Sequence, residues 1–276
     1  MKKCCTILLQ RNLPEVTNKI GDQILQNNGE ITDFYVVESG SDDNMLSKFT
    51  KNTFHANWDE ARENGLRTGR GFNFGLTELK KTGKEYEYYF LVTGDTVFEQ
   101  KNCVEILLKE MESNPKMGII SPLSRKWGNE FSHLWDKNRT QSVALIPHVA
   151  WMFRSELIDI ISEDFSSKDF MGYLYDGTNF RCYDADTEIL VKSYLYDFFP
   201  AITSKVYIKE DELLTDRNFK VMKTENRETH KKLMWDEGMA WLKRKYNFDG
   251  KQQMRQLLHQ SRHLFFNRNP NLRSMI

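Results

Sequence analysis

The fold of this chain is decided around residues 89–98, which read Tyr-Phe-Leu-Val-Thr-Gly-Asp-Thr-Val-Phe. The apolar half of this stretch belongs to a strand predicted over residues 86–92. The strand ends in Thr93-Gly94-Asp95-Thr96, whose turn-forming and acidic residues predict a polar loop. The apolar run at 31–37 ends in the same way, in a carboxylate-rich loop over residues 38–43. Two strands that end in acidic or hydroxyl-bearing loops are the first indication of a functional site.

Outward from this stretch, strand patterns alternate with helical periodicity. A helix is predicted from Pro14, because proline suits a first helical turn, to the Asn-Asn-Gly sequence at 27–29. Strands that alternate with helices at this pitch predict an α/β fold with a mostly parallel central sheet flanked by helices. In such sheets ligands bind beyond the carboxyl ends of the strands. The other elements predicted in this half are a glycine-rich, basic stretch at 67–75 that leads into a helix through Leu79, a helix at 104–111, and strands at 4–9, near Phe54 and at 118–122.

The second half of the chain has a less regular pattern. Strands are predicted at 142–153 and 205–208, and helices at 155–161 and 184–197. From Lys220 onward the sequence is charged and helical in period, and residues 265–276 are expected to fray. We therefore expect one large domain over 1–215, with halves at 1–122 and 123–215, and a C-terminal helical extension over 216–276.

The composition indicates a globular chain without a bulk attraction to nucleic acid. Among its 276 residues, Lys+Arg and Asp+Glu are both 39, so the formal net charge is zero. No apolar run approaches the roughly 20 residues that span a bilayer, so we expect no transmembrane segment. Cys4, Cys5, Cys103 and Cys182 have neither metal-ligand spacing nor the density of a disulfide scaffold. These features predict a reduced, cytoplasmic protein, free in solution or at the periphery of a membrane.

Six segments between about Thr6 and about Tyr207 resemble, in order, the family 2 type of glycosyltransferases with the GT-A fold. They correspond to the loop after the second strand, a Gly/Asn segment, the strand of an Asp-x-Asp motif, the strand after it, an apolar segment ending in Arg, and a late acidic motif. The segments are residues 35–43, 70–75, 89–98, 117–122, 150–154 and 184–189. By this resemblance, the first half of the domain would bind a nucleotide sugar and the second half an acceptor.

The resemblance implies an enzyme that moves a glycosyl group from a UDP-, GDP- or dTDP-sugar to a hydroxyl of a saccharide or glycolipid acceptor. It implies inversion at the anomeric carbon, with a single base that activates the acceptor for in-line attack. A divalent cation, Mn²⁺ or Mg²⁺, would neutralise the departing diphosphate. Hard cations of this kind take oxygen ligands and often use only one or two protein carboxylates beside phosphate oxygens.

The resemblance also implies roles for individual residues. Asp95 would be the metal ligand, and Gly94 would let the backbone approach the diphosphate. Glu38 would meet the base or the ribose of the donor. Arg70 would reach a phosphate with a bidentate guanidinium, or serve as an exposed salt-bridge partner. The residues expected to bind the nucleotide sugar are Glu38, Ser39, Asp42, Arg70, Asn73, Gly94 and Asp95.

Two carboxylates are candidates for the general base, Asp184 and Asp186. Only one of them can have this role for one acceptor, because the base must lie within hydrogen-bond reach of the hydroxyl. Asp184 fits the Glu-Asp pair of the family, although Tyr183 stands where the Glu is usual. The sequence Asp186-Thr187-Glu188 matches a variant of the motif, and we favour Asp186 slightly.

The chain departs from the family pattern at two places. Thr93 stands where the first Asp of Asp-x-Asp would be, and no His follows the strand at 205–208. His230 is expected to be a solvated helix residue. These departures leave open a catalytically inactive GT-A-like subunit with a binding or scaffold role. A nucleotidyltransferase would need a glycine-rich loop after the first strand, where residues 9–13 contain none, and a dinucleotide-dependent oxidoreductase would need Gly-x-Gly-x-x-Gly there.

Overall fold

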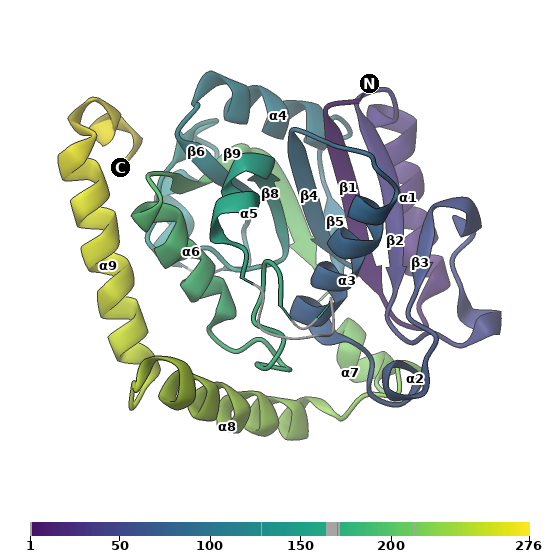
Figure 1. Ribbon diagram of the computed structural model, residues 1–276. Helices are drawn as coiled ribbons and strands as arrows, with labels where there is room; N and C mark the ends of the chain where they lie inside the picture. The colour runs from purple at the N-terminus through teal and green to yellow at the C-terminus, as the bar shows by residue number, and fades with distance from the viewer. Residues whose placement is uncertain (1, 128, 164–169, 171, 212) are drawn as a thin grey trace.

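The computed structural model describes residues 2–127, 129–163, 170, 172–211 and 213–276. A single curled sheet forms its centre, with the strand order β3-β2-β1-β4-β8-β6-β9-β5, and β7 pairs with β9 outside this path (Figure 1). The strands are β1 (Cys4–Gln10), β2 (Thr32–Glu38), β3 (Thr53–His55), β4 (Tyr88–Thr93), β5 (Thr96–Phe98), β6 (Met117–Ser124), β7 (Thr140–Gln141), β8 (Ala150–Arg154) and β9 (Phe199–Glu210).

The N-terminal half of the sheet is parallel. β1 pairs in parallel with both β2 and β4, and β2 pairs in parallel with β3. All seven residues of β1 are buried, as expected for a strand with helices on both of its faces. β8 is antiparallel to β4 and β6, whereas β6 and β9 are again parallel. The predicted α/β class, with a central sheet flanked by helices, is confirmed; four of the eight described strand pairings are parallel and four are antiparallel, since β5 and β7 both run antiparallel to β9.

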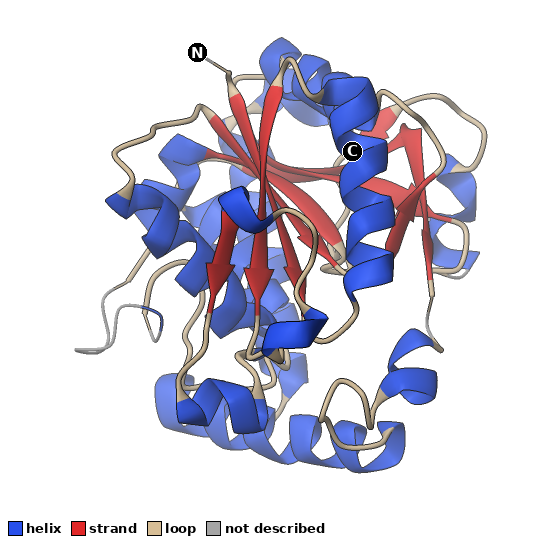
Figure 2. Ribbon diagram, turned by 90° about the vertical axis from the view of Figure 1, so that its right-hand side faces the viewer, coloured by secondary structure: helices blue, strands red, loops and turns tan. Residues whose placement is uncertain are grey.

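Helices cover both faces of the sheet (Figures 1 and 2). α1 and α4 contact each other on one face, while α3, α5 and α6 lie on the other (Figure 1). Glycine lets α3 approach closely, because a Cβ at Gly75 would lie 2.6 Å from Val37 Cγ2. These helices are α1 (Pro14–Asn28), α3 (Arg67–Lys81), α4 (Cys103–Ser113), α5 (Ser155–Ile161) and α6 (Ala185–Leu195), and a short helix, α2 (Asp59–Asn64), precedes α3.

The chain after β9 wraps around the domain. α7 (Leu214–Asn218) leads to α8 (Arg227–Tyr246), which runs beneath the sheet domain in Figure 1, and α9 (Lys251–Arg268) then packs along α6. Trp241 of α8 is fully buried and donates its indole N–H to Asp176 at 2.9 Å. Lys245 forms an ion pair with the buried Glu188 at 2.7 Å. Buried groups therefore attach the C-terminal helices to the domain.

Two details of the sequence prediction are wrong. The strand predicted at 142–153 is limited to β8, because the chain turns at Pro147, whose carbonyl accepts hydrogen bonds from Val149 N at 3.2 Å and Trp151 Nε1 at 2.9 Å. The C-terminal residues do not fray. Phe265 and Phe266 are buried, and the Met275 carbonyl accepts a hydrogen bond from Ser142 N at 2.5 Å. Within the described ranges, no helix is long and apolar enough to cross a membrane.

Candidate active site

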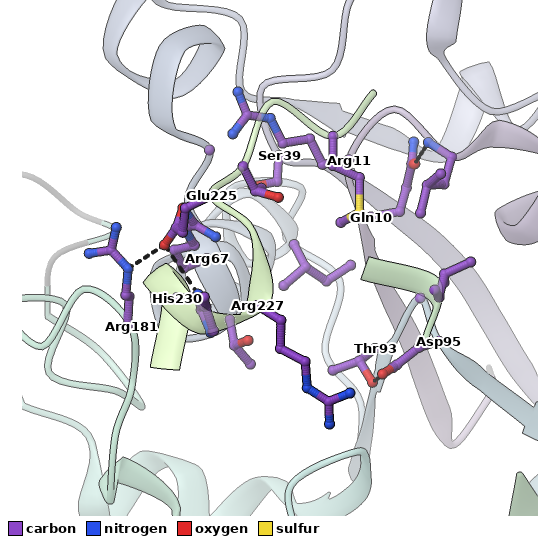
Figure 3. Close-up of a pocket in the computed structure, with 18 of the residues that line it drawn as sticks. Gln10, Arg11, Ser39, Arg67, Thr93, Asp95, Arg181, Glu225, Arg227 and His230 are labelled. Carbon is purple, nitrogen blue, oxygen red and sulfur yellow. Dashed lines mark hydrogen bonds and ion pairs between the residues drawn. The ribbon is translucent and has the colours of Figure 1, made fainter. Parts of the chain in front are cut away.

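A cavity of about 540 Å³ lies at the carboxyl ends of β1, β2 and β4. This is the edge of the sheet at which parallel α/β folds place their ligands. The sheet side of the cavity is formed by the ends of β1 and β4, by Ser39 after β2, and by the residues that open α3. The opposite side is formed by the segment 210–231, which leads from β9 into α8. Figure 3 shows these two sides facing one another.

The loop after β4 brings a carboxylate to the cavity. Asp95 lines it together with Thr93 and Gly94. The Thr93 hydroxyl donates a hydrogen bond to Asp95 Oδ1 at 2.5 Å, and Asp211 N donates to the Asp95 carbonyl at 3.1 Å. Burial raises the pKa of the Asp95 carboxyl, and the hydrogen bond from Thr93 opposes this effect. A positively charged partner at this position would favour the ionised form of Asp95.

The loop after β2 places Ser39 in the cavity but turns Glu38 inward. Glu38 is fully buried, and its carboxylate accepts hydrogen bonds from Gln10 Nε2, from Ser41 Oγ at 2.7 Å and from Ser47 N at 2.8 Å. Burial raises its pKa, against the effect of these hydrogen bonds. Ser39 Oγ accepts a hydrogen bond from Leu66 N at 2.7 Å and lines the cavity. Glu38 therefore organises the loop that positions Ser39.

Three further residues expected to bind the nucleotide sugar lie outside the cavity lining and bind the polypeptide. Arg70 Nε donates to the Gly177 carbonyl at 2.7 Å, and Asn73 Nδ2 donates to the Tyr175 carbonyl at 2.7 Å. Asp42 accepts hydrogen bonds from Lys223 Nζ at 2.5 Å and from Asn12 Nδ2 at 3.3 Å. The first two hold the segment that leads into α6, and Asp42 holds the segment before α8.

The two candidate bases lie at the start of α6. Asp184 precedes the helix in a left-handed conformation, with φ 62°, and its Oδ1 accepts a hydrogen bond from Thr187 Oγ1 at 2.8 Å. Its buried Oδ2 has no hydrogen-bond partner among the described residues. Asp186 Oδ1 accepts from Thr187 N at 2.8 Å. Burial raises the pKa of Asp186 to about 6, and the charge of Asp184 adds to this rise.

Asp186 acts electrostatically on Tyr175, which in turn contacts a residue of the cavity lining. Burial raises the pKa of the Tyr175 hydroxyl, and the charge of Asp186 contributes to the rise. The same hydroxyl lies 2.8 Å from His148 Nε2, and His148 lines the cavity. Arg181, which also lines it, stands three residues before Asp184. Neither Asp184 nor Asp186 belongs to the lining of the cavity.

Sequence reasoning missed a group of positively charged side chains in the cavity. His230, expected to be solvated, lines the cavity and approaches Glu225 Oε1 with Nδ1 at 3.1 Å. Glu225 also pairs with Arg67 and with Arg181 (Figure 3). The sequence signals were the basic character of the stretch that opens α3 and the charged segment from Lys220 onward, which by itself predicts only an exposed helix face. The full group of cationic residues is Arg11, Arg67, Arg181, Arg227, His230 and Lys231.

The oxygen atoms available to a divalent cation are few. Over the residues that the structure describes, no group of three or more His, Cys, Asp or Glu side chains could hold a metal ion. At the end of β4, Asp95 is the one carboxylate that lines the cavity, and the Thr93 hydroxyl next to it occupies the position of a second carboxylate in an Asp-x-Asp motif. A cation here would depend on oxygen atoms of its ligand for most of its coordination.

No protein-family model and no curated protein matches the sequence. Solved structures do match. A mannosyltransferase from Pyrobaculum calidifontis, PcManGT, in complex with GDP-Man and Mn²⁺, aligns with a TM-score of 0.56 at 12% identity, over 97% of this chain and 71% of that one. Residues 1–349 of TarS from S. aureus, in complex with UDP-GlcNAc, align with a TM-score of 0.52 at 14% identity, over 97% and 73% of the two chains. The GT-A-like fold expected from the sequence is thereby confirmed.

Proposed function

We propose that this chain is a glycosyltransferase that moves a sugar from a nucleotide-diphosphate sugar to a hydroxyl of a saccharide or glycolipid acceptor. The observation that carries the proposal is the cavity at the carboxyl ends of β1, β2 and β4, in which Asp95 faces a wall of cationic side chains. A diphosphate needs positive charge around it, and the sheet edge is where this class of fold binds nucleotides. Two proteins of similar fold were solved with GDP-Man and with UDP-GlcNAc, which supports a donor of this class.

The cationic residues bind and orient the donor in this proposal. Guanidinium groups form paired hydrogen bonds with phosphate oxygens, so Arg67, Arg181 and Arg227 are suited to the diphosphate. Their charges also stabilise the leaving diphosphate as negative charge develops on it. Gly94 keeps the β4 loop close to β1, since a Cβ there would lie 3.1 Å from the Leu9 carbonyl oxygen. This leaves the floor of the cavity to backbone and small side chains.

Asp95 fits a role as the protein carboxylate of a divalent cation. It lines the cavity, burial raises its pKa, and a bound cation would keep it ionised. Mn²⁺ or Mg²⁺ would take the remaining oxygen ligands from the donor phosphates, and would supply Lewis-acid neutralisation of the leaving group. PcManGT was solved with Mn²⁺, which supports this assignment.

We propose Asp186 as the general base, with Asp184 as the other candidate. A pKa of about 6 leaves Asp186 mostly ionised at pH 7 and close to the value at which a base is most effective. In this role Asp186, which lies outside the cavity lining in this structure, would have to come within hydrogen-bond reach of the acceptor hydroxyl and take its proton as the oxygen attacks the anomeric carbon. A single base that activates the acceptor for one in-line displacement of the nucleoside diphosphate would invert the configuration at the anomeric carbon.

A second candidate function is a GT-A-like subunit that binds a nucleotide sugar without turning it over. The observation in its favour is Thr93, whose hydroxyl donates to Asp95 where a second carboxylate would otherwise assist a metal. The two candidates differ in turnover and agree on nucleotide binding. Release of free nucleoside diphosphate from the cognate nucleotide sugar would identify the transferase.

The test is isothermal titration calorimetry with UDP, GDP, CDP and dTDP, each with Mn²⁺ and with EDTA. We expect micromolar binding of one nucleotide, lost with EDTA and at least tenfold weaker in Asp95→Asn. Asp43→Asn is the matched control, because the Asp43 side chain is 74% exposed and pairs with Arg62 outside the cavity lining. Binding of none of the four nucleotides to the folded protein would refute both candidate functions.

A further inference from the structure

The geometry points to an oxyanion subsite in the cavity, formed by Arg67, Arg181 and His230, in which Glu225 holds the place of a phosphate. We propose that a phosphate group of the donor displaces Glu225 from this subsite. The identity of the ligand rests on the proposed function, whereas the existence of the subsite rests on the contacts of Glu225 alone. Glu225 then acts as a competitor, built into the chain, that sets how tightly the donor binds.

Glu225 is held by three partners at once, the guanidinium groups of Arg67 and Arg181 and the imidazole of His230. One carboxylate oxygen, Oε2, accepts a hydrogen bond from Arg67, and Oε1 accepts one from Arg181 Nε at 2.6 Å and lies 3.1 Å from His230 Nδ1 (Figure 3). Burial alone would raise the pKa of Glu225, but these partners lower it to about 2. A carboxylate with donors on both oxygens presents the same pattern of acceptors as two oxygens of a phosphate.

The two arginine partners of Glu225 also have contacts of their own. The guanidinium groups of Arg67 and Arg181 lie over the Phe180 ring, with their carbon atoms 5.6 Å and 5.3 Å from its centre. Arg181 also pairs with Glu237 through Nη1. The side chains of Arg67 and Arg181 are 16% and 11% exposed, so both cations are largely removed from water. Displacement of Glu225 would therefore leave a preorganised pair of guanidinium groups rather than two loose side chains.

A further buried cation, Arg11, lies beside this subsite, and only part of its guanidinium group has hydrogen-bond partners among the described residues. Arg11 is 5% exposed and lines the cavity, and its Nη2 donates to the carbonyls of Arg62 at 2.7 Å and Glu63 at 3.1 Å. Its Nε and Nη1 have no hydrogen-bond partner among the described residues. Burial, assisted by the charge of Arg67, lowers the pKa of Arg11 to about 10. Unsatisfied buried donors are costly, so an anion that reaches Arg11 gains more than Glu225 does.

The charge balance of the cavity favours a diphosphate over a singly charged occupant. Five Arg and Lys side chains line it, against the four carboxylates of Asp95, Glu210, Asp216 and Glu225. When Glu225 leaves, the excess of positive charge rises from one to two. That excess matches an anion with two or more negative charges.

The experiment compares Glu225→Gln with Glu228→Gln by calorimetry, with inorganic pyrophosphate as the probe in EDTA. Glu228 is the control, because it lies in the first turn of α8 three residues after Glu225 and its side chain is 87% exposed; its carboxylate lies 3.7 Å from Lys231 of the cavity lining, so this variant controls for the loss of a negative charge beside the cavity. We expect Glu225→Gln to bind pyrophosphate about tenfold more tightly than the wild type, and Glu228→Gln to match the wild type within twofold. Arg181→Gln should bind about tenfold more weakly. Equal or weaker binding by a folded Glu225→Gln variant overturns the subsite.

Two further measurements separate the alternatives. Titration with glucuronate tests whether the subsite takes a carboxylate of an acidic sugar; a gain for glucuronate without a gain for pyrophosphate overturns the assignment to the donor phosphates. If Glu225→Gln proves unstable, hydrogen exchange of wild-type residues 219–226 provides the second test. We expect pyrophosphate to change exchange there at least threefold, and an unchanged pattern counts against displacement. If pyrophosphate behaves as expected but no nucleotide binds, the subsite stands and the transferase proposal fails.

Discussion

Replacement of Asp186 by Asn should stabilise the protein at neutral pH. Burial raises the pKa of this carboxyl from 3.8 to about 6, a difference of about 2 units. At about 1.4 kcal/mol per unit, the folded state loses about 3 kcal/mol of stability when Asp186 ionises. Asp186 retains some contact with solvent, which reduces the effect, so we expect a gain of 1–3 kcal/mol for Asp186→Asn at about pH 8.

The sign of the pH dependence follows from the raised pKa. Between about pH 3.8 and 6, the folded state of the wild type keeps the Asp186 proton while the unfolded state loses it. The stability of the wild type relative to the variant therefore falls as the pH rises through this window, and levels off above it. Asn carries no titrating proton, and its side-chain oxygen can still accept the hydrogen bond from Thr187 N. The difference in unfolding free energy should be small at pH 4 and largest above pH 7.

The assay is urea unfolding of the wild type and of Asp186→Asn at intervals from pH 4 to 8. A constant m-value across the series would show that both proteins unfold in two states. Asp184→Asn is the comparison, because the charge of Asp184 contributes to the raised pKa of Asp186. That variant should move the pH window of the wild type downward without removing it. A stability difference that does not change with pH, or that decreases from pH 4 to 8, would refute the reasoning. Loss of turnover by about 10²-fold or more in Asp186→Asn would support its role as the base.

Two more outcomes test the packing that positions the site. Gly75→Val should lower the free energy of unfolding by about 1–3 kcal/mol, because even a Cβ at this position would lie 2.6 Å from Val37 Cγ2. Gly250→Ala is the comparison, and it should change the free energy of unfolding by less than about 0.5 kcal/mol because a Cβ there would meet open space. Trp241→Phe should cost about 1–3 kcal/mol in the same measurement, because it leaves the buried Asp176 without its 2.9 Å hydrogen bond, and an unchanged midpoint would show that this bond does not hold α8.

The fold could be predicted from the sequence because its strands are buried on both faces. A strand such as β1 is apolar along its whole length, and short runs of this kind between helical patterns have few alternative interpretations. The strand prediction was wrong for the segment 142–149 because this segment is apolar without forming a strand. Ile146 and Val149 are buried there, so the segment is apolar, but Pro147 interrupts the backbone pairing that a strand needs. Burial without secondary structure has no period to detect.

The candidate site was predictable only where it follows a strand directly. Ser39, Gly94 and Asp95 line the cavity because the carboxyl end of a parallel strand determines where the next residues lie. Arg70 and Asn73 belong to a helix, where the partner of a side chain depends on distant parts of the chain. Both bind carbonyl groups about 100 residues further along. A polar residue near a binding loop can serve the loop as well as the ligand, and the sequence alone does not separate these roles.

The C-terminal segment shows how far a site can extend beyond its motifs. A boundary at 215 passes between Leu214 and Asp216, and both of these residues line the cavity. The ion pair of Arg67 with Glu225 joins positions 158 residues apart, so no local pattern contains it. Arg227 and His230 follow on the first turns of α8, which Trp241 attaches to the domain further along. The C-terminal extension therefore supplies one wall of the cavity and much of its positive charge. It belongs to the same site as the ends of the sheet strands that form the opposite wall.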